Sequence, residues 1–305
     1  MAKSVTVLMG GWSGEREVSL VSGRTVAAAL HEAGYEARTV DIDRDPRAIA
    51  TALEPRPDVV FNALHGPFGE DGRVQGILDL LEIPYTHSGV LASALAMDKP
   101  MAKRLFGCAG IRCAEHVIVS RSAAVSGDAL PRPYVVKPLR EGSSLGVTVV
   151  TEGSDPCFAA DGWAYGDTVM VERYVPGREI TVAVMGERAL GVTEIRPLAG
   201  FYDYRAKYTE GATEHLIPAP IPADAYDTAM RFSVEAHKAL GCRGVSRADL
   251  RYDDAAGGAE GVYLLEVNTQ PGMTPMSLVP ELAAHAGIDF PALVSWMVEH
   301  AACDA

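Results

Sequence analysis

Residues 244–268 read GVSRADLRYDDAAGGAEGVYLLEVN, and this stretch is the most informative part of the chain. Two largely apolar segments, 244–252 and 262–268, flank a loop of Asp, Ala and Gly residues, which is typical of a β-hairpin. Side chains alternate between the two faces of a strand, so every second residue points the same way. The pattern therefore predicts a hairpin that turns about Gly257-Gly258.

One face of this predicted hairpin carries four polar side chains: Arg247, Asp249, Glu266 and Asn268. With the turn at the glycine pair, Asp249 lies opposite Glu266 and their Cβ atoms are about 5 Å apart. A divalent cation relieves the repulsion between two such carboxylates, and all-oxygen ligands suit Mg²⁺ or Mn²⁺ rather than zinc. The alternative is a solvated face with ordinary cross-strand charges. The rigid turn at 269–274 directly after the hairpin favours a built site.

Cations and a glycine-serine loop that suit a polyphosphate lie upstream. Lys137 ends an apolar strand, Lys99 lies on the helix that begins near residue 91, and residues 140–147 read REGSSLGV between two strands. Glycines permit close backbone approach, and serine hydroxyls and amides donate to anions. The loop lacks the GxxxxGK[ST] pattern of a P-loop, and residues 10–14 lack the GxGxxG spacing of a dinucleotide site. Taken alone, such a glycine-serine loop is better explained as a hairpin turn.

A connector between two predicted strands offers a further ligand surface. Glu172 and Glu179 flank residues 173–178, which read RYVPGR. Adenine could lie against Tyr174 and Val175, with a carboxylate on the ribose hydroxyls. The alternative for this connector is two surface glutamates on a linker.

The first third of the chain alternates strands and helices. Apolar runs at 5–9 and 58–64 are each followed by glycine-containing loops, and helical spacing extends to about residue 33 and again over 74–81. This order predicts a βαβ unit with a parallel sheet. A further helix is expected over about 91–106.

The remainder reads as short strands followed by helices. Runs at 180–185 and 189–195 predict a hairpin, residues 198–216 a long functional loop, and residues 223–240 a helix. A strand pair and a C-terminal helix complete the chain. Four more β-type runs precede these elements, at 117–119, 134–136, 147–150 and 169–171. The expected fold class is α+β in three parts.

Composition narrows the function. The 305 residues are 48% hydrophobic and 22% charged, with a formal net charge of -13, which argues against a nucleic-acid binder or an anionic-membrane surface protein. The five cysteines include no CxxC pair, so a reduced environment is expected and a structural zinc site is not. No signal peptide or membrane span is predicted, and a cytoplasmic location is expected.

Motif blocks follow one another along nearly the whole chain: GGWSGEREVS (10–19), LHGPFGEDG (64–72), MDK (97–99), KPLREGSSLG (137–146), FYDYRAKY (201–208), RAD (247–249), EVNTQPGMT (266–274) and SLVP (277–280). Together they resemble the ATP-grasp superfamily, and the outer blocks narrow the resemblance to D-alanine–D-alanine ligases. Residues 120–131 and 153–168 are short for the family, so a trimmed central domain is expected.

The resemblance implies a three-domain ATP-grasp fold. An N-terminal α/β domain (1–96) would bind the first substrate, a central lid domain (97–178) would cover the nucleotide, and a C-terminal domain (179–305) would hold the metal site. It also implies a reaction in which ATP phosphorylates the carboxylate of one D-alanine and the amine of a second displaces the phosphate. The product would be D-alanyl-D-alanine for peptidoglycan precursors, and hence for the cell wall and cell shape.

The resemblance assigns catalytic roles to five residues. Glu15, at a helix start, would grip the ammonium of the first D-alanine, and Ser143 and Tyr208 would be its hydrogen-bonded companions. Arg247 and the Gly272 amide would stabilise the oxyanion of the tetrahedral intermediate. Closing the loops that carry Ser143 and Tyr208 would exclude water from the acylphosphate.

Other positions would bind the second substrate, the nucleotide and the metals. The second D-alanine would meet His65, Ser277 and Leu278, although a buried structural histidine is an alternative for His65. ATP would contact Lys99, Lys137, Ser144 and Lys207 through its phosphates, Glu172, Tyr174 and Val175 through adenine, and Glu179 through ribose. Two Mg²⁺ or Mn²⁺ ions would bind Asp249, Glu266 and Asn268.

The sequence is compatible with three alternative functions. A related ligase could accept a hydroxy acid such as D-lactate, although Tyr208 goes with amine acceptors in the family. A different ATP-grasp ligase is disfavoured by the Glu15 and Ser277-Leu278 motifs. A nucleotide sensor without activity would have lost a metal ligand or a phosphate lysine, and these positions are filled. A homodimer is expected, because family members are commonly dimers.

Overall fold

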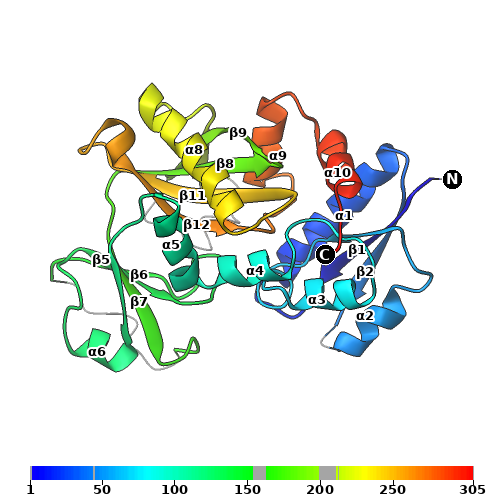
Figure 1. The fold of residues 1–305 in the computed structure, drawn as a ribbon, viewed down its shortest axis with the longest axis horizontal. Helices are drawn as coiled ribbons and strands as arrows, with labels where there is room; N and C mark the ends of the chain where they lie inside the picture. The colour runs from blue at the N-terminus through cyan, green and yellow to red at the C-terminus, as the bar shows by residue number, and fades with distance from the viewer. Residues whose placement is uncertain (1, 44, 154–162, 199–210, 212, 305) are drawn as a thin grey trace.

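The computed structural model describes residues 2–43, 45–153, 163–198, 211 and 213–304. Its described strands form one parallel and two antiparallel sheets, which confirms the α+β expectation and the parallel N-terminal sheet. Figure 1 shows the parallel sheet at one end of the molecule and both antiparallel sheets at the other, with α4 (Val90–Met97) crossing between them.

The N-terminal part contains β1 (Ser4–Gly10), α1 (Arg16–Glu32), β2 (Glu36–Ile42), α2 (Pro46–Ala52), β3 (Val59–Asn62) and α3 (Arg73–Leu80). The sheet order β2-β1-β3 puts β1 in the centre, which explains its continuous apolar run. Gly34, with φ of +90°, follows the end of α1 in the left-handed conformation that closes many helices. The loops after β1 and β3 leave the same edge of this parallel sheet, where sites of such folds gather.

The helix expected over 91–106 is two helices, α4 and α5 (Lys99–Cys108). Asp98 separates them with φ of −88° and ψ of 91°, and its side chain caps α5 by accepting a hydrogen bond from Met101 N at 3.1 Å. Pro100 in the first turn of α5 cannot continue a preceding helix. The break places Lys99 at the start of a helix rather than in the middle of one.

The central sheet has the order β4-β7-β5-β6, with antiparallel neighbours. A small core beneath it contains Tyr134, Val136, Val150 and Val171, and the loop at 139–147 joins two of its strands. Its elements are β4 (His116–Ser120), α6 (Arg121–Ser126), β5 (Tyr134–Pro138), β6 (Thr148–Val150) and β7 (Thr168–Arg173).

The C-terminal sheet has the order β10-β9-β8-β11-β12. Its elements are β8 (Arg178–Met185), β9 (Arg188–Pro197), β10 (Thr213–Leu216), α8 (Ala223–Ala239), β11 (Val245–Tyr252), a short 3-10 helix η2 (Gly258–Gly261), β12 (Val262–Asn268), α9 (Leu278–His285) and α10 (Phe290–Glu299). Two expectations are wrong here. The segment expected as loop to residue 216 ends in β10, which pairs with β9, and the single C-terminal helix is two helices separated by Gly287 with φ of +83°.

The register predicted for the β11–β12 hairpin is confirmed. Asp249 pairs with Glu266 and Arg247 with Asn268, and a bulge at Leu265 lies just beyond these pairs, where Leu250 pairs with Leu264. The alternate residues of β11, including Ala248 and Leu250, pack in the core under α8. The polar set therefore lies on the opposite face of the sheet.

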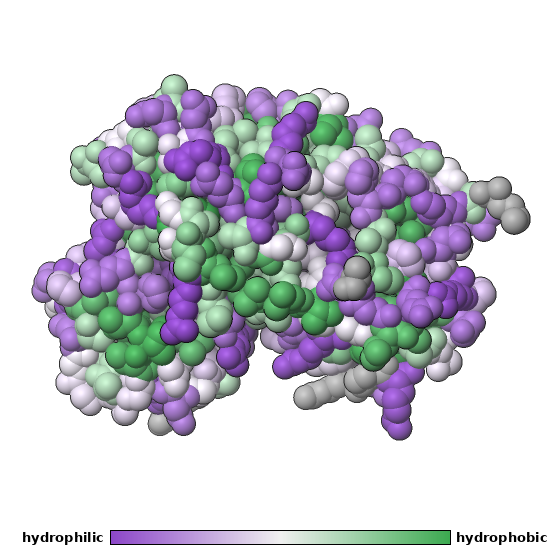
Figure 2. Space-filling model, in the orientation of Figure 1, coloured by the Kyte–Doolittle hydropathy of each residue, from purple (hydrophilic) through white to green (hydrophobic). Residues whose placement is uncertain are grey.

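The first and last helices of the chain, α1 and α10, pack against each other. Side chains of α10, including Leu293 and Met297, share one core with Val26 and Leu30 of α1, and Figure 1 shows the C-terminus beside the N-terminal sheet. On the face shown in Figure 2, hydrophilic residues alternate with hydrophobic areas across the middle and on the part with β5 to β7, and the outline is indented between that part and the N-terminal part. Within the described ranges, no helix has the length and apolar character needed to cross a bilayer.

Candidate active site

Two adjoining cavities contain the predicted site residues. The larger, of about 620 Å³, is lined by Glu15, His65, Lys99, Ser143, Arg247, Glu266, Asn268, Gly272, Ser277 and Leu278, among others. The smaller, of about 80 Å³, is lined by Lys99, Lys137, Ser144, Glu172, Tyr174, Val175, Glu179, Asp249 and Glu266, among others. Every predicted site residue that the structure describes therefore lines a cavity, and Lys99 and Glu266 line both. Lys207 and Tyr208 lie outside the described residues.

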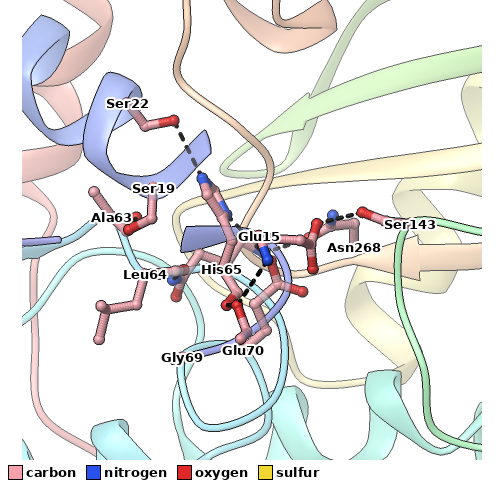
Figure 3. Close-up of polar contacts among 12 residues, drawn as sticks. Glu15, Ser19, Ser22, Ala63, Leu64, His65, Gly69, Glu70, Ser143 and Asn268 are labelled. Atoms are coloured by element: carbon pink, nitrogen blue, oxygen red, sulfur yellow. Dashed lines mark hydrogen bonds and ion pairs between the residues drawn. The ribbon is translucent and has the colours of Figure 1, made fainter. Parts of the chain in front are cut away.

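Glu15 is held at the start of α1 on one wall of the larger cavity. Glu15 is only 5% exposed. Its carboxylate accepts a hydrogen bond from Ser143 Oγ, which lies on the loop between β5 and β6 (Figure 3). Ser13 Oγ accepts a hydrogen bond from the Glu15 amide at 3.2 Å and donates to His65 O at 2.7 Å. The helix N-terminus favours a negative charge there, so the cavity presents a fixed anion that suits an ammonium group.

The loop that carries Ser143 faces both cavities. Ser143 and Ser144 adopt φ values of 51° and 58°, and their side chains line the larger and the smaller cavity, respectively. The base of the loop is tied to α5, because Lys99 N donates to Leu139 O at 3.1 Å and Lys99 Nζ to Glu141 O at 2.5 Å. One short loop thus contributes to the walls of both cavities.

His65 is fixed between two partners. Its Nε2 lies 3.2 Å from Ser22 Oγ and its Nδ1 lies 3.2 Å from Glu70 Oε1, and the residue is 6% exposed (Figure 3). The ring still lines the larger cavity. The structure therefore combines the two sequence alternatives, a buried histidine with satisfied nitrogens that also forms part of the cavity wall.

The polar face of the hairpin separates the two cavities. Asp249 accepts two hydrogen bonds from Arg247, at 2.8 and 2.7 Å, and one from Thr181 Oγ1 at 2.8 Å. Arg247 lines the larger cavity and Asp249 the smaller, so this ion pair spans the boundary. The Arg247–Asp249 pair is a contact that the sequence did not predict, and it fixes the orientation of both side chains.

The chemistry of this face fits a hard divalent cation. Two carboxylates and the Asn268 amide provide oxygen donors only, and Asn268 Oδ1 is oriented by a 2.8 Å hydrogen bond from Gln270 N. Oxygen sets of this kind suit Mg²⁺ and Mn²⁺. In the described part of the chain, no group of three or more His, Cys, Asp or Glu side chains is placed to hold a metal ion. The candidate metal site therefore needs the Asn268 amide oxygen as its third ligand.

The smaller cavity is built around a buried carboxylate. Glu172 is 1% exposed and forms ion pairs with Lys137 and with Lys103, the latter at 2.5 Å. Burial raises the pKa of Glu172, but the two ammonium groups outweigh it and lower that pKa to about 2. The alternative of a solvated surface glutamate is therefore wrong for Glu172.

The far wall of the smaller cavity combines backbone and aromatic surface. Arg251 donates to Val175 O at 3.1 Å and to Gly177 O at 2.8 Å, and its guanidinium lies 3.6 Å from Glu179. The same guanidinium lies 5.7 Å from the centre of the Tyr174 ring. These contacts hold the connector between β7 and β8 in a defined position beside Glu179.

Comparisons with known proteins identify the family. Residues 106–299 match the family model described as D-ala D-ala ligase C-terminus, and residues 44–88 match the one described as D-ala D-ala ligase N-terminus. A D-alanine–D-alanine ligase of Rhodospirillum rubrum is 59% identical over 307 residues, with all of both chains covered. The chain belongs to the D-alanine–D-alanine ligase family. A second family member, from Paramagnetospirillum magneticum, is 60% identical with the same coverage.

Solved structures of the ligase family share the fold. The D-alanine–D-alanine ligase from Bacillus anthracis complexed with ATP is 31% identical, with a TM-score of 0.80 over 98% of this chain and 97% of that one. The VanG D-Ala:D-Ser ligase from Enterococcus faecalis is also 31% identical, with a TM-score of 0.80 over 98% and 99% of the two chains. These similarities confirm the ATP-grasp expectation for the fold.

Three residues of this ligase-family site were missed in the sequence. Lys103 lies four positions after Lys99 on α5, a spacing that puts two helical side chains on the same face and could have revealed it. Arg251 continues the alternation of Arg247 and Asp249 along β11, so it too could have been predicted. Glu141 lines both cavities, and burial raises its pKa against the opposing effect of Lys99. No pattern in the loop sequence marks Glu141.

Proposed function

We propose that this protein joins two D-alanine molecules into D-alanyl-D-alanine, with conversion of ATP to ADP and phosphate. The observation that carries the proposal is the pair of adjoining cavities that share Lys99 and Glu266 as a wall. One cavity offers an anion for an ammonium group, and the other offers lysines for phosphates. A reaction that transfers phosphate from a nucleotide to an amino acid needs its two substrates to meet in this way.

The first chemical step forms an acylphosphate. The ammonium of one D-alanine binds Glu15, while its carboxylate points toward the shared wall with Lys99. A carboxylate oxygen attacks the γ-phosphorus of ATP, the bond to the β-phosphate oxygen breaks, and ADP leaves. Lys99 and Lys137 position the phosphates and offset their negative charge.

The second step forms the peptide bond. The second D-alanine binds near Ser277, at the start of α9, with its carboxylate toward that helix terminus. Its free amine attacks the acyl carbon and the carbon–nitrogen bond forms. Phosphate leaves as the carbon–oxygen bond breaks, and it takes up the proton that the nitrogen loses. Arg247 and the Gly272 amide donate to the oxyanion of the intermediate.

Asp249, Glu266 and Asn268 would hold two Mg²⁺ or Mn²⁺ ions, for which their oxygens are suited. When bound, such ions neutralise charge on the transferring phosphate. Asp249 has a second role, because it also orients Arg247 through two hydrogen bonds. Loss of Asp249 would therefore affect both the metal and the oxyanion contacts.

The identity of the second substrate can be tested directly. The similarity to a D-Ala:D-Ser ligase, together with the position of Tyr208 outside the described residues, makes the second substrate the point to test. Purified protein is given ATP, Mg²⁺ and D-alanine, with equimolar D-serine or D-lactate added in parallel. Mass spectrometry should find D-alanyl-D-alanine as the main product in every mixture. A mixed product in excess of the dipeptide would refute the assignment of the second substrate.

We also propose three domains, at 1–96, 97–178 and 179–305. Ala102 and Phe106 of α5, from the second of these, pack in the core of the C-terminal sheet. A homodimer is proposed, and light scattering coupled to size exclusion tests it. The cytoplasm is proposed as the location, because ATP is available there.

A further inference from the structure

Lys103 is a buried cation for which the proposed reaction has no direct use. The residue is 3% exposed, one helical turn beyond Lys99 on α5. Lys103 lines neither of the two cavities formed by the described residues. A buried ammonium is costly unless a counter-charge offsets it, so its partner explains its presence.

That partner is Glu172, which lies between two lysines. Lys103 Nζ is 2.5 Å from Glu172 Oε1, and Lys137 Nζ contacts Glu172 Oε2. Within the described part of the chain, neither Lys103 Nζ nor Glu172 Oε1 makes a hydrogen bond of good geometry. Their mutual ion pair is therefore what offsets the burial of both atoms.

The two lysines differ in what else they can reach. The side chain of Lys137 is 12% exposed and lines the smaller cavity, whereas that of Lys103 is 1% exposed and stays behind Glu172. Burial works to lower the pKa of Lys103, but Glu172 raises it above the ordinary value, so the ammonium stays charged at neutral pH. Two ammonium groups and one carboxylate leave one positive charge in excess, on the side where a phosphate would bind.

We propose that Lys103 is the permanent counter-ion of Glu172 and so frees Lys137 to turn toward the nucleotide phosphates. This inference rests on the proposed use of ATP. Without Lys103, movement of Lys137 to a phosphate would leave the Glu172 carboxylate buried and unpaired, which is strongly unfavourable. Lys103 is thus a positioning residue that acts through Glu172 and Lys137 and touches no substrate.

The test is a double-mutant cycle on ATP binding, measured by calorimetry with Mg²⁺ and without D-alanine. Lys103→Met should raise the Kd for ATP by about tenfold, equivalent to about 1.4 kcal/mol. The same change in a Glu172→Gln background should leave the Kd of that background unchanged, because no buried carboxylate remains. Lys103→Arg should retain the native Kd. Lys238→Met, which removes a half-exposed lysine paired with Glu187, is the matched control and should also retain it.

The outcomes separate the two ideas. An equal rise in Kd on Lys103→Met in both backgrounds, or no rise in either, overturns the role of Lys103. If Lys103→Met alone does not fold, the Lys103→Met/Glu172→Gln protein should fold, because neutralising both partners removes the unpaired charge. Failure of that double variant to fold also overturns the inference. Absence of ATP binding by the native protein would instead refute the proposed function.

Discussion

Lys99 Nζ lies 3.5 Å from Glu266 Oε2, and both side chains line the two cavities at once. Lys99 begins α5, and Glu266 lies near the end of β12. Their contact marks the place where an amino acid in one cavity and a nucleotide in the other would meet. We therefore propose that phosphoryl transfer takes place beside this pair.

Replacement of Glu266 tests that placement. Glu266→Gln should lower kcat by at least about 100-fold, because it removes a charge that acts on the transferring phosphate. The side chain is 32% exposed, so the midpoint of thermal unfolding should change little. Steady-state phosphate release and thermal unfolding measure the two effects. Glu260→Gln, in the same hairpin but 79% exposed, is the control. Loss of cooperative unfolding in Glu266→Gln would show that Glu266 is mainly structural.

The two adjacent serines of the glycine-serine loop should have separable effects. Ser143→Ala removes the hydrogen bond to Glu15 and should raise the KM for D-alanine by about tenfold or more, since bonds to charged groups contribute about 1.5–3 kcal/mol. Ser144→Ala lies on the nucleotide side and should raise the KM for ATP instead. Both residues have positive φ, so the backbone effect is matched between the variants. Initial rates over both substrates decide, and a shift in the same KM for both variants would contradict the assignment.

A buried histidine under the C-terminal sheet predicts how stability changes with pH. Burial, aided by Lys238, lowers the pKa of His237 to about 4, and its Nδ1 lies 2.7 Å from Ser246 Oγ. Between about pH 6.5 and 4 the unfolded chain binds a proton there that the folded chain does not, so the free energy of unfolding falls as the pH falls. In this pH range the free energy of unfolding of the native protein should therefore fall more steeply than that of His237→Gln, by about 1.4 kcal/mol per pH unit.

Chemical denaturation at about pH 7 and pH 5.5 measures this difference. The exposed residue His31 supplies the control, and His31→Gln should show the native pH dependence. An unchanged pH dependence in His237→Gln would mean that His237 takes up its proton equally in the folded and unfolded chains, which would contradict the prediction.

Local pattern explains which parts of the fold could be predicted. The period of two along β11 and β12, with a glycine pair at the turn, was enough to set Asp249 opposite Glu266. The break at Asp98 was also visible, as a capping residue followed by proline, and should have divided the predicted helix. β10 has too few residues for a periodic signal, and its pairing with β9 is set only in the folded sheet.

Contacts between distant segments could not be predicted. The sequence leaves Glu172 as either a ligand contact or a surface residue, because its burial between Lys103 and Lys137 depends on other elements. The Arg247–Asp249 pair is hidden for a different reason, since the strand face carries several polar side chains and the sequence does not say which of them pair. Burial and side-chain choice among several partners are properties of the folded protein, and short motifs do not carry them.

The most direct test of the central claim is phosphate release from ATP by the native protein with Mg²⁺ and either D-alanine or L-alanine. We expect phosphate release that depends on D-alanine and equals the D-alanyl-D-alanine formed, with no response to L-alanine. Equal release with both enantiomers, or no release with either, would contradict it.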